Sequence, residues 1–308
     1  MSGPVQSALS IAPAQPAQVA EVLALAARGW PLDERAGQLR VVADLLKSAA
    51  GDHVHLLGAW RGKSLVGAIV AQTLAGRAAV VWPPTILANE SAATGGELFA
   101  ALHQRLVAAG AVLVQALLPS VIEEGAQALM LNGYLHAGDL RHLWADAAVF
   151  PRESPDLPFA LEAWSPANNG RLVQVVEATY RGSLDCPVLD GLREVGDVLA
   201  GYQAVGEFRA ENWLIVREGG ADVGCLLLAR HSAQNQLEIV YLGLAPQVRG
   251  CGWGYLLTRH AQWIAQKAGH ERLVLAVDAA NRPAIAAYER AGLVAWGARS
   301  VFVRSLTK

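Results

Sequence analysis

One segment constrains the fold more than any other: an apolar strand that runs through a glycine-rich turn into a helix. Residues 237–244 are apolar on both faces apart from Glu238, and this pattern predicts a central, buried strand. After Pro246, residues 249–254 read Arg-Gly-Cys-Gly-Trp-Gly and lead into an amphipathic helix. Such a turn directs backbone N–H groups and the positive end of the helix at one point. It therefore predicts an anion site that suits a pyrophosphate.

Other folds also bind anions at glycine-rich turns, and many such turns bind no ligand. The residues that follow the turn and its position among the strands must therefore distinguish between these folds. No Gly-Lys-Ser or Gly-Lys-Thr follows the glycines, which excludes a Walker A loop. A dinucleotide-binding fold would carry the turn after its first strand. Here the turn follows the fourth strand expected in its half of the chain, which argues against that fold as well.

The turn resembles motif A of the GNAT acetyltransferases, Gln/Arg-x-x-Gly-x-Gly/Ala, beginning at Gln247, and residues 275–293 resemble their motif B. In motif B, Asn281 precedes Pro283, and Gly292 ends the helix. The resemblance implies acetyl-CoA as a co-substrate and no metal. Asn281 could also be an ordinary helix N-cap. The resemblance assigns these positions to acetyl-CoA binding: Leu242, Gly243, Leu244, Arg249, Gly250, Cys251, Gly252, Trp253, Gly254 and Asn281.

Two residues match positions where the family carries catalytic side chains. Tyr288 matches the tyrosine that protonates the departing CoA thiolate, although a half-buried aromatic residue in a helix needs no such role. Glu238 lies in a strand that resembles the one carrying a general base, which draws a proton from the incoming amine through water. Burial would raise the pKa of this carboxyl toward the range that a base needs. The alternative for Glu238 is a structural carboxylate paired with an Arg or a Tyr.

Residues 178–187 resemble the loop between the first two helices of tandem GNAT proteins related to mycothiol synthase. This resemblance implies that Tyr180 and Asp185 lie on the acceptor side of the cleft. Asp185 would supply a counter-charge to a protonated amine, or it would only cap a turn. Cys186 is a tempting nucleophile, but no His follows at a suggestive spacing, and direct transfer needs no covalent enzyme intermediate.

The chain is expected to contain two domains. Three prolines between residues 151 and 158, with no helical or strand period, indicate a linker. We therefore expect domains at residues 1–150 and 159–308, since domains cluster near ~100–150 residues. The two halves repeat one order of elements, which predicts an internal duplication; two unrelated α/β domains are the alternative. With the resemblance, the expected fold is α/β, with two tandem GNAT-like domains, each a mixed, mostly antiparallel sheet flanked by helices.

The expected elements follow from hydrophobic periodicity. In the first half we expect helices over residues 18–28, 96–109 and 122–132, and strands over 55–60, 64–71, 78–81 and 112–117. In the second half we expect helices over residues 170–180, 191–202, 252–268 and 282–291. Its expected strands cover 159–163, 213–217, 223–229, 237–244 and 272–277, with a final pair near 294 and at 301–305.

The first half of the chain lacks the glycine-rich turn of motif A. Its corresponding turn has Gly95 and Gly96 but lacks the Arg-Gly-x-Gly-x-Gly run, and two prolines lie in the preceding strand. A degenerate, scaffolding or substrate-shaping domain is therefore favoured over a second catalytic centre. His53 and His55 share one strand face, but no third ligand is near them in sequence, so ordinary strand residues are favoured over a metal site.

Composition excludes several classes of protein. The net charge is −2 and no run of Lys or Arg occurs, which argues against a nucleic-acid partner. Three distant cysteines fit neither a disulfide framework nor a metal motif and suggest a reducing compartment. No basic residue precedes Arg28, and prolines break the N-terminal apolar stretch, unlike a signal peptide. With no apolar run of ~18 residues, we expect a cytoplasmic protein with no membrane partner; the sequence does not indicate its oligomeric state.

These inferences predict an acetyl-CoA-dependent N-acetyltransferase. The acceptor would be the primary amine of a small molecule, which attacks the thioester directly. Two alternatives come from other classes: a CoA-binding sensor or structural pseudoenzyme, and a protein N-acetyltransferase. No residue pattern in the sequence identifies the acceptor itself.

Overall fold

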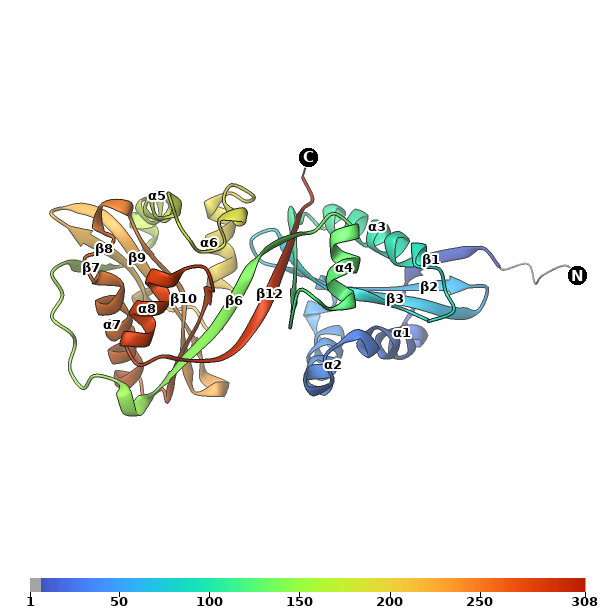
Figure 1. Ribbon diagram of the computed structural model, residues 1–308, viewed down its shortest axis with the longest axis horizontal. Helices are drawn as coiled ribbons and strands as arrows, with labels where there is room; N and C mark the ends of the chain where they lie inside the picture. The colour runs from blue at the N-terminus through green and yellow to red at the C-terminus, as the bar shows by residue number, and fades with distance from the viewer. Residues whose placement is uncertain (1–6, 308) are drawn as a thin grey trace, which may run out of the picture. The chain divides into compact units, whose positions relative to one another are not determined.

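The computed structural model describes residues 7–307 of the chain, which form two compact units (Figure 1). Of the described residues, unit 1 comprises 7–136 and 300–307, and unit 2 comprises 137–299. Residues 1–6, which fall in the predicted first domain, lie outside the described residues. Each unit is a mixed sheet with apolar clusters on both faces, and the predicted α/β class is confirmed.

Unit 2 has a sheet with the strand order β6-β11-β10-β9-β8-β7. One apolar cluster joins the sheet to α7 and α8, and a second joins it to α5 and α6. The elements are β6 (Leu135–Asp146), β7 (Ala160–Ala163), α5 (Asn169–Tyr180), α6 (Val195–Gln203), β8 (Trp213–Glu218), β9 (Ala221–His231), β10 (Gln236–Leu244), α7 (Trp253–Lys267), β11 (Arg272–Asp278) and α8 (Arg282–Arg290).

Strands β10 and β11 run parallel but separate halfway along their length. Residues 236–239 of β10 pair with residues 272–275 of β11. An irregularity between Ile239 and Tyr241 then bends β10, which continues to pair with β9 as far as Leu244. Because a bulge bends its strand and disrupts the ladder locally, the two parallel strands open into a V. This opening creates the site described below.

Unit 1 repeats this order of elements. Its sheet has the order β1-β2-β3-β4-β5-β12, and β4 and β5 are its corresponding parallel pair. The elements are β1 (Leu9–Pro13), α1 (Val19–Ala26), α2 (Leu32–Lys47), β2 (Val54–Arg61), β3 (Ser64–Leu74), β4 (Ala78–Ile86), α3 (Ala93–Ala108), β5 (Leu113–Leu118), α4 (Glu124–Leu131) and β12 (Val294–Ser305).

The units exchange their last strands. β6 follows α4 in sequence, yet its residues 140–146 pair with β11 of unit 2. β12 follows α8, yet its residues 300–305 pair with β5 of unit 1. The compact units therefore divide within β6 and β12, whereas the sequence placed the division at residues 151–158, which lie inside unit 2. The difference arises because hydrogen bonding between strands, and not chain order, assigns a strand to a sheet.

The predicted pair of strands at the C-terminal end is wrong, since Val294–Ser305 is one continuous strand. Gly297 lies within it and introduces no turn. Among the residues that the structure describes, no helix has the length and apolar character needed to cross a membrane.

Candidate functional site

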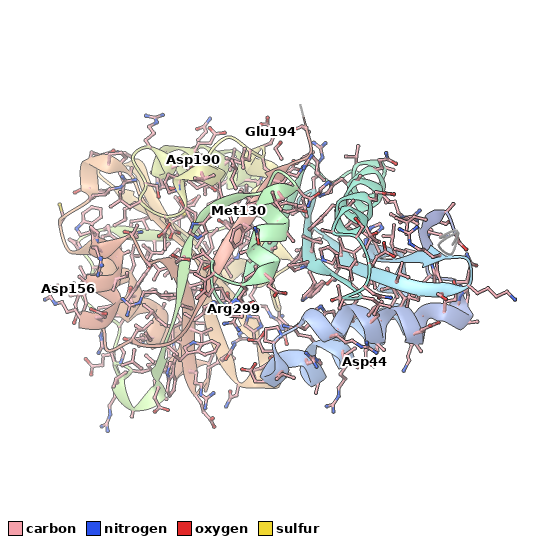
Figure 2. All side chains as sticks on the ribbon, turned by 45° about the vertical axis from the view of Figure 1, so that its right-hand side comes forward. Asp44, Met130, Asp156, Asp190, Glu194 and Arg299 are labelled. Carbon is pink, nitrogen blue, oxygen red and sulfur yellow. The ribbon has the colours of Figure 1, made fainter. Side chains whose placement is uncertain are left out.

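The opening between β10 and β11 holds a cavity of about 390 Å³. It is bounded by the α5–α6 connection, the end of β10, the turn before α7 and helix α8, and we call it the α7 cleft. Figure 2 labels Asp190 and Glu194, two exposed residues of the α5–α6 connection. Most of the predicted site residues line the cleft: Asp185, Leu242, Gly243, Leu244, Arg249, Gly250, Gly252, Trp253, Gly254, Asn281 and Tyr288.

The glycine turn gives the cleft its backbone donors. Gly250 and Gly252 adopt φ values of 79° and 82°, a region that residues with a Cβ rarely enter. Gly252 is the N-cap of α7, so the first N–H groups of this 15-residue helix have no carbonyl of the preceding turn to bond. Cys251 is exposed and does not line the cleft. The turn therefore concentrates backbone donors and the positive helix end on one side of the cavity.

Arg249 uses its guanidinium to hold the cleft together. Its Nε donates to the carbonyl of Leu244 at 2.9 Å, and its Nη1 and Nη2 donate to the carbonyls of Gly182 and Thr179 at 2.9 and 2.7 Å. These bonds tie the end of β10 to the α5–α6 connection. The guanidinium is thus occupied by carbonyls, and the donors that the turn offers to a ligand come from the backbone.

Helix α8 and its N-cap contribute two more of the predicted residues of the cleft. Asn281 is the N-cap, and its side-chain oxygen accepts from the N–H of Ala284 at 3.3 Å. Tyr288 lies two turns further along the same helix with only 8% of its surface exposed. Burial, helped by the negative charge of Asp185, raises the pKa of Tyr288 well above its usual value near 10. Its hydroxyl therefore keeps its proton at neutral pH.

Asp185 braces the α5–α6 connection against the end of β11. Its Oδ1 accepts from the backbone N–H of Asp278 at 2.8 Å, while Oδ2 of Asp278 accepts from the N–H of Cys186 at 3.0 Å. Desolvation and the neighbouring Asp278 carboxylate raise the pKa of Asp185. Desolvation also raises the pKa of the Cys186 thiol to about 12, which disfavours the nucleophilic thiolate.

Tyr180 does not line the α7 cleft. Its ring packs edge-on against Tyr241, with ring centroids 6.0 Å apart, and Tyr241 in turn shares a 2.7 Å hydrogen bond with the Thr179 hydroxyl. Burial raises the pKa of Tyr180 to about 12. Tyr180 is therefore part of the aromatic packing under α5, and a direct contact with an acceptor stays a prediction.

Glu238 faces a second cavity, of about 590 Å³, that shares Leu275 and Ala276 with the α7 cleft. We call it the Glu238 cavity; its remaining lining residues are His142, Trp144, Gln236, Arg272, Val274 and Trp296. The carboxylate Oε2 lies 2.6 Å from Nε2 of His231, and the Glu238 side chain keeps 29% of its exposure. The expected burial of Glu238 is therefore only partial, because the cavity leaves this face of β10 partly open.

Sequence reasoning missed the residues around Glu238. His142 and Trp144 belong to β6, which was not predicted as a strand, and their neighbours in the sheet come from another half of the chain. His231 ends β9, seven residues before Glu238, and only the hairpin register brings the two together. The alternation of Leu143 and Ala145 with polar or aromatic residues was the available signal for β6.

His53 and His55, which the sequence places on one strand face, have separate surroundings in the structure. His53 Nδ1 lies 3.1 Å from the Thr73 hydroxyl, and Nε2 of His55 is buried. Among the described residues, no group of three or more His, Cys, Asp or Glu is arranged to hold a metal ion.

The comparison with known families concerns the region that builds the α7 cleft and part of the Glu238 cavity. Residues 177–293 match the Acetyltransferase (GNAT) family. This region is a GNAT domain.

The mycothiol acetyltransferase of Salinispora arenicola is 30% identical over 161 residues, which are 51% of this chain and 47% of that relative. A mycothiol acetyltransferase of Corynebacterium glutamicum is 34% identical over 94 residues, covering 30% of this chain and 32% of its own. The chain thus spans at most about half the length of these curated relatives.

Solved structures extend the similarity of fold beyond the GNAT domain. A GCN5-related N-acetyltransferase from Sphaerobacter thermophilus aligns over 97% of this chain and 96% of its own, with a TM-score of 0.59 and 17% identity. A tandem GNAT protein from the clavulanic acid biosynthesis pathway covers 98% of this chain and 99% of its own, with a TM-score of 0.50 and 12% identity. At these identities the likeness concerns the fold alone, and it matches the repeat of elements in the two units.

Proposed function

We propose that this protein is an acetyl-CoA-dependent N-acetyltransferase that acts on the primary amine of a small molecule. The observation that carries the proposal is the α7 cleft of the GNAT domain, which joins a backbone anion site to the buried Tyr288 hydroxyl. The names of the curated relatives, mycothiol acetyltransferases, support a small acceptor. We propose only the class of acceptor, because those alignments cover half of each relative or less.

The backbone N–H groups of the cleft suit the pyrophosphate of acetyl-CoA. A pyrophosphate would bind the N–H groups at the start of α7, where a Cβ at Gly250 or Gly252 would strain the turn. Beyond Ile239, the backbone of β10 on the side of β11 no longer pairs with that strand. The backbone of Leu242, Gly243 and Leu244 could therefore bond the pantetheine arm and thioester, and Asn281 could add a side-chain contact.

Tyr288 is the proposed general acid. Acetyl-CoA supplies an acetyl thioester, whose leaving group is a thiolate with a conjugate acid near pKa ~8.5. Since burial keeps the Tyr288 hydroxyl protonated, it has a proton to donate as the thiolate departs. The raised pKa makes the Tyr288 phenolate a stronger base than the departing thiolate, so complete transfer to a free thiolate is uphill, and the hydroxyl must donate in concert with the breaking of the carbon–sulfur bond.

Glu238 is the proposed general base, acting directly or through water. The amine arrives as an ammonium ion, gives one proton to the carboxylate, and its nitrogen then bonds the acetyl carbon as the carbon–sulfur bond breaks. The thiolate takes the Tyr288 proton, and the acetylated nitrogen loses its second proton to solvent to give the neutral amide. Glu238 then releases its proton to solvent, and Tyr288 regains one from solvent. His231, at 2.6 Å from the carboxylate, would hold Glu238 in position.

Thiol release tests the proposal. The purified protein is given acetyl-CoA and a panel of small primary amines, and free CoA is measured with a thiol reagent. We expect amine-dependent release. Calorimetric binding of acetyl-CoA without release on any amine would favour a CoA-binding sensor, and release only with peptides would favour a protein N-acetyltransferase.

A further inference from the structure

The Glu238 cavity is built on one face of the sheet from residues that the strand register sets side by side. Glu238 of β10 is opposite Val274 of β11, which is opposite Trp144 of β6. One row away on the same face, Gln236 is opposite Arg272. A carboxylate and a guanidinium therefore rise from diagonal positions whose Cα atoms are roughly 7–8 Å apart.

The floor between these two charges is made of small side chains, while the walls are aromatic. Val274 and Ala276 of β11 form the floor. Trp296 stands at one wall with 63% of its surface exposed and meets the His142 ring edge-on, with centroids 5.3 Å apart. Large exposed aromatic rings beside a concave apolar floor with a few charged groups are typical of ligand sites, because such rings bury apolar area at little cost in conformational entropy.

Arg272 is available to a ligand. Its guanidinium lies over the Trp144 ring, 5.1 Å from the centroid, and the residue is exposed. Within the part of the chain that the structure describes, no hydrogen bond or ion pair occupies this guanidinium. The guanidinium of Arg249, by contrast, donates hydrogen bonds to three backbone carbonyls. An arginine with free N–H groups on an aromatic face is suited to a carboxylate, which accepts two parallel hydrogen bonds.

We propose that the Glu238 cavity binds the acceptor and selects an amine that carries a carboxylate on a flat ring. The amine would lie at Glu238, the ring between Trp144 and Trp296, and the carboxylate at Arg272. This inference rests on the proposed function. The Glu238 cavity and the α7 cleft share two lining residues, Leu275 and Ala276. That junction is where the strands open, so an amine at Glu238 is adjacent to the cleft proposed for the thioester.

Calorimetry without acetyl-CoA tests the cavity separately from catalysis. The probes are 4-(aminomethyl)benzoate, whose amine and carboxylate have about the required separation, and 4-(aminomethyl)benzamide, which lacks the negative charge. We expect the benzoate to bind the unmodified protein about 10-fold more tightly than the benzamide. Arg272→Gln should abolish this preference, and Arg272→Lys should restore part of it. Arg152→Gln removes an exposed cation outside the cavity and should keep the full preference.

The outcomes separate the two proposals. Equal binding of the two probes, no binding of either, or an unchanged preference in Arg272→Gln overturns the acceptor site. Trp296→Ala should weaken both probes by similar factors, and unchanged binding there overturns the place assigned to the ring. If the preference is found but no amine releases CoA from acetyl-CoA, the cavity is a carboxylate-amine site and the proposed acetyl transfer is wrong.

Discussion

At the scale of single residues, the α7 cleft relies on backbone conformation more than on charged side chains. Among the described residues that line the cleft, Arg249 carries the only guanidinium. This guanidinium donates hydrogen bonds to three backbone carbonyls. The donors left for an anion are the N–H groups that Gly250 and Gly252 orient through their positive φ values. Binding at the turn should therefore respond to a Cβ more strongly than to a change of charge.

Gly252→Val should weaken acetyl-CoA binding at least ~10-fold, or ~1.4 kcal/mol. A β-branched residue at φ 82° is strained, and relief of that strain would rotate the N–H groups away from the ligand. Isothermal titration calorimetry on the folded variant measures the loss. The matched control is Gly220→Val, at φ 87° in the turn between β8 and β9, which carries a similar strain far from the cleft. Unchanged affinity in Gly252→Val would contradict the assignment of the turn.

Tyr288→Phe should lower kcat far more than it raises the KM for acetyl-CoA. The hydroxyl proton is needed only while the thiolate departs, so its loss affects the transition state and not the bound ground state. The ring itself, which packs in the core of unit 2, is retained. Steady-state kinetics with a panel amine distinguishes the cases: equal changes in both constants would indicate cofactor positioning, and full activity would reduce Tyr288 to a packing residue.

At the scale of elements, the sequence predicted what depends on local signals. The glycine turn, β10, α7 and α8 each carry their own pattern of apolar residues, caps or glycines, and these signals placed most of the α7 cleft. Helix α2 (Leu32–Lys47) was missed because Val42 is its only fully buried residue, so it lacks a strong apolar stripe. β6 was missed as a strand, and the pairings of β6 and β12 depend on partners more than a hundred residues away.

The α5–α6 connection offers a test at this scale. Asp185→Asn keeps an oxygen that can accept from the Asp278 N–H, so thermal stability and acetyl-CoA affinity should stay nearly unchanged. If Asp185 also attracts the ammonium group of the acceptor, loss of its charge should raise the KM for the acceptor severalfold. Thermal denaturation, calorimetry and acceptor kinetics measure these three quantities. Unchanged acceptor kinetics would leave Asp185 with its bracing role alone.

At the scale of the whole molecule, the two units share an order of elements but differ in the chemistry of their clefts. Unit 1 has its own cavity of about 730 Å³ near the start of α3 and the end of β4. Gly95 and Gly96 lie inside α3 and do not form a turn before it, and neither has a positive φ. Among the described residues that line this cavity, Glu123 and Glu124 are the charged ones. The cavity therefore presents negative charge where unit 2 presents backbone donors.

The chain should accordingly bind one acetyl-CoA, in unit 2. A pyrophosphate in the unit 1 cavity would face two carboxylates and would find a helix start without oriented glycines, so its desolvation would not be repaid by new hydrogen bonds. Calorimetric titration should give a stoichiometry near one per chain. Gly252→Val should remove most of the binding heat, whereas Glu123→Gln, which removes one charge from the unit 1 cavity, should leave the stoichiometry at one. Two equivalent sites, or binding that survives intact in Gly252→Val, would show that unit 1 retains a cofactor site built from contacts other than a glycine turn.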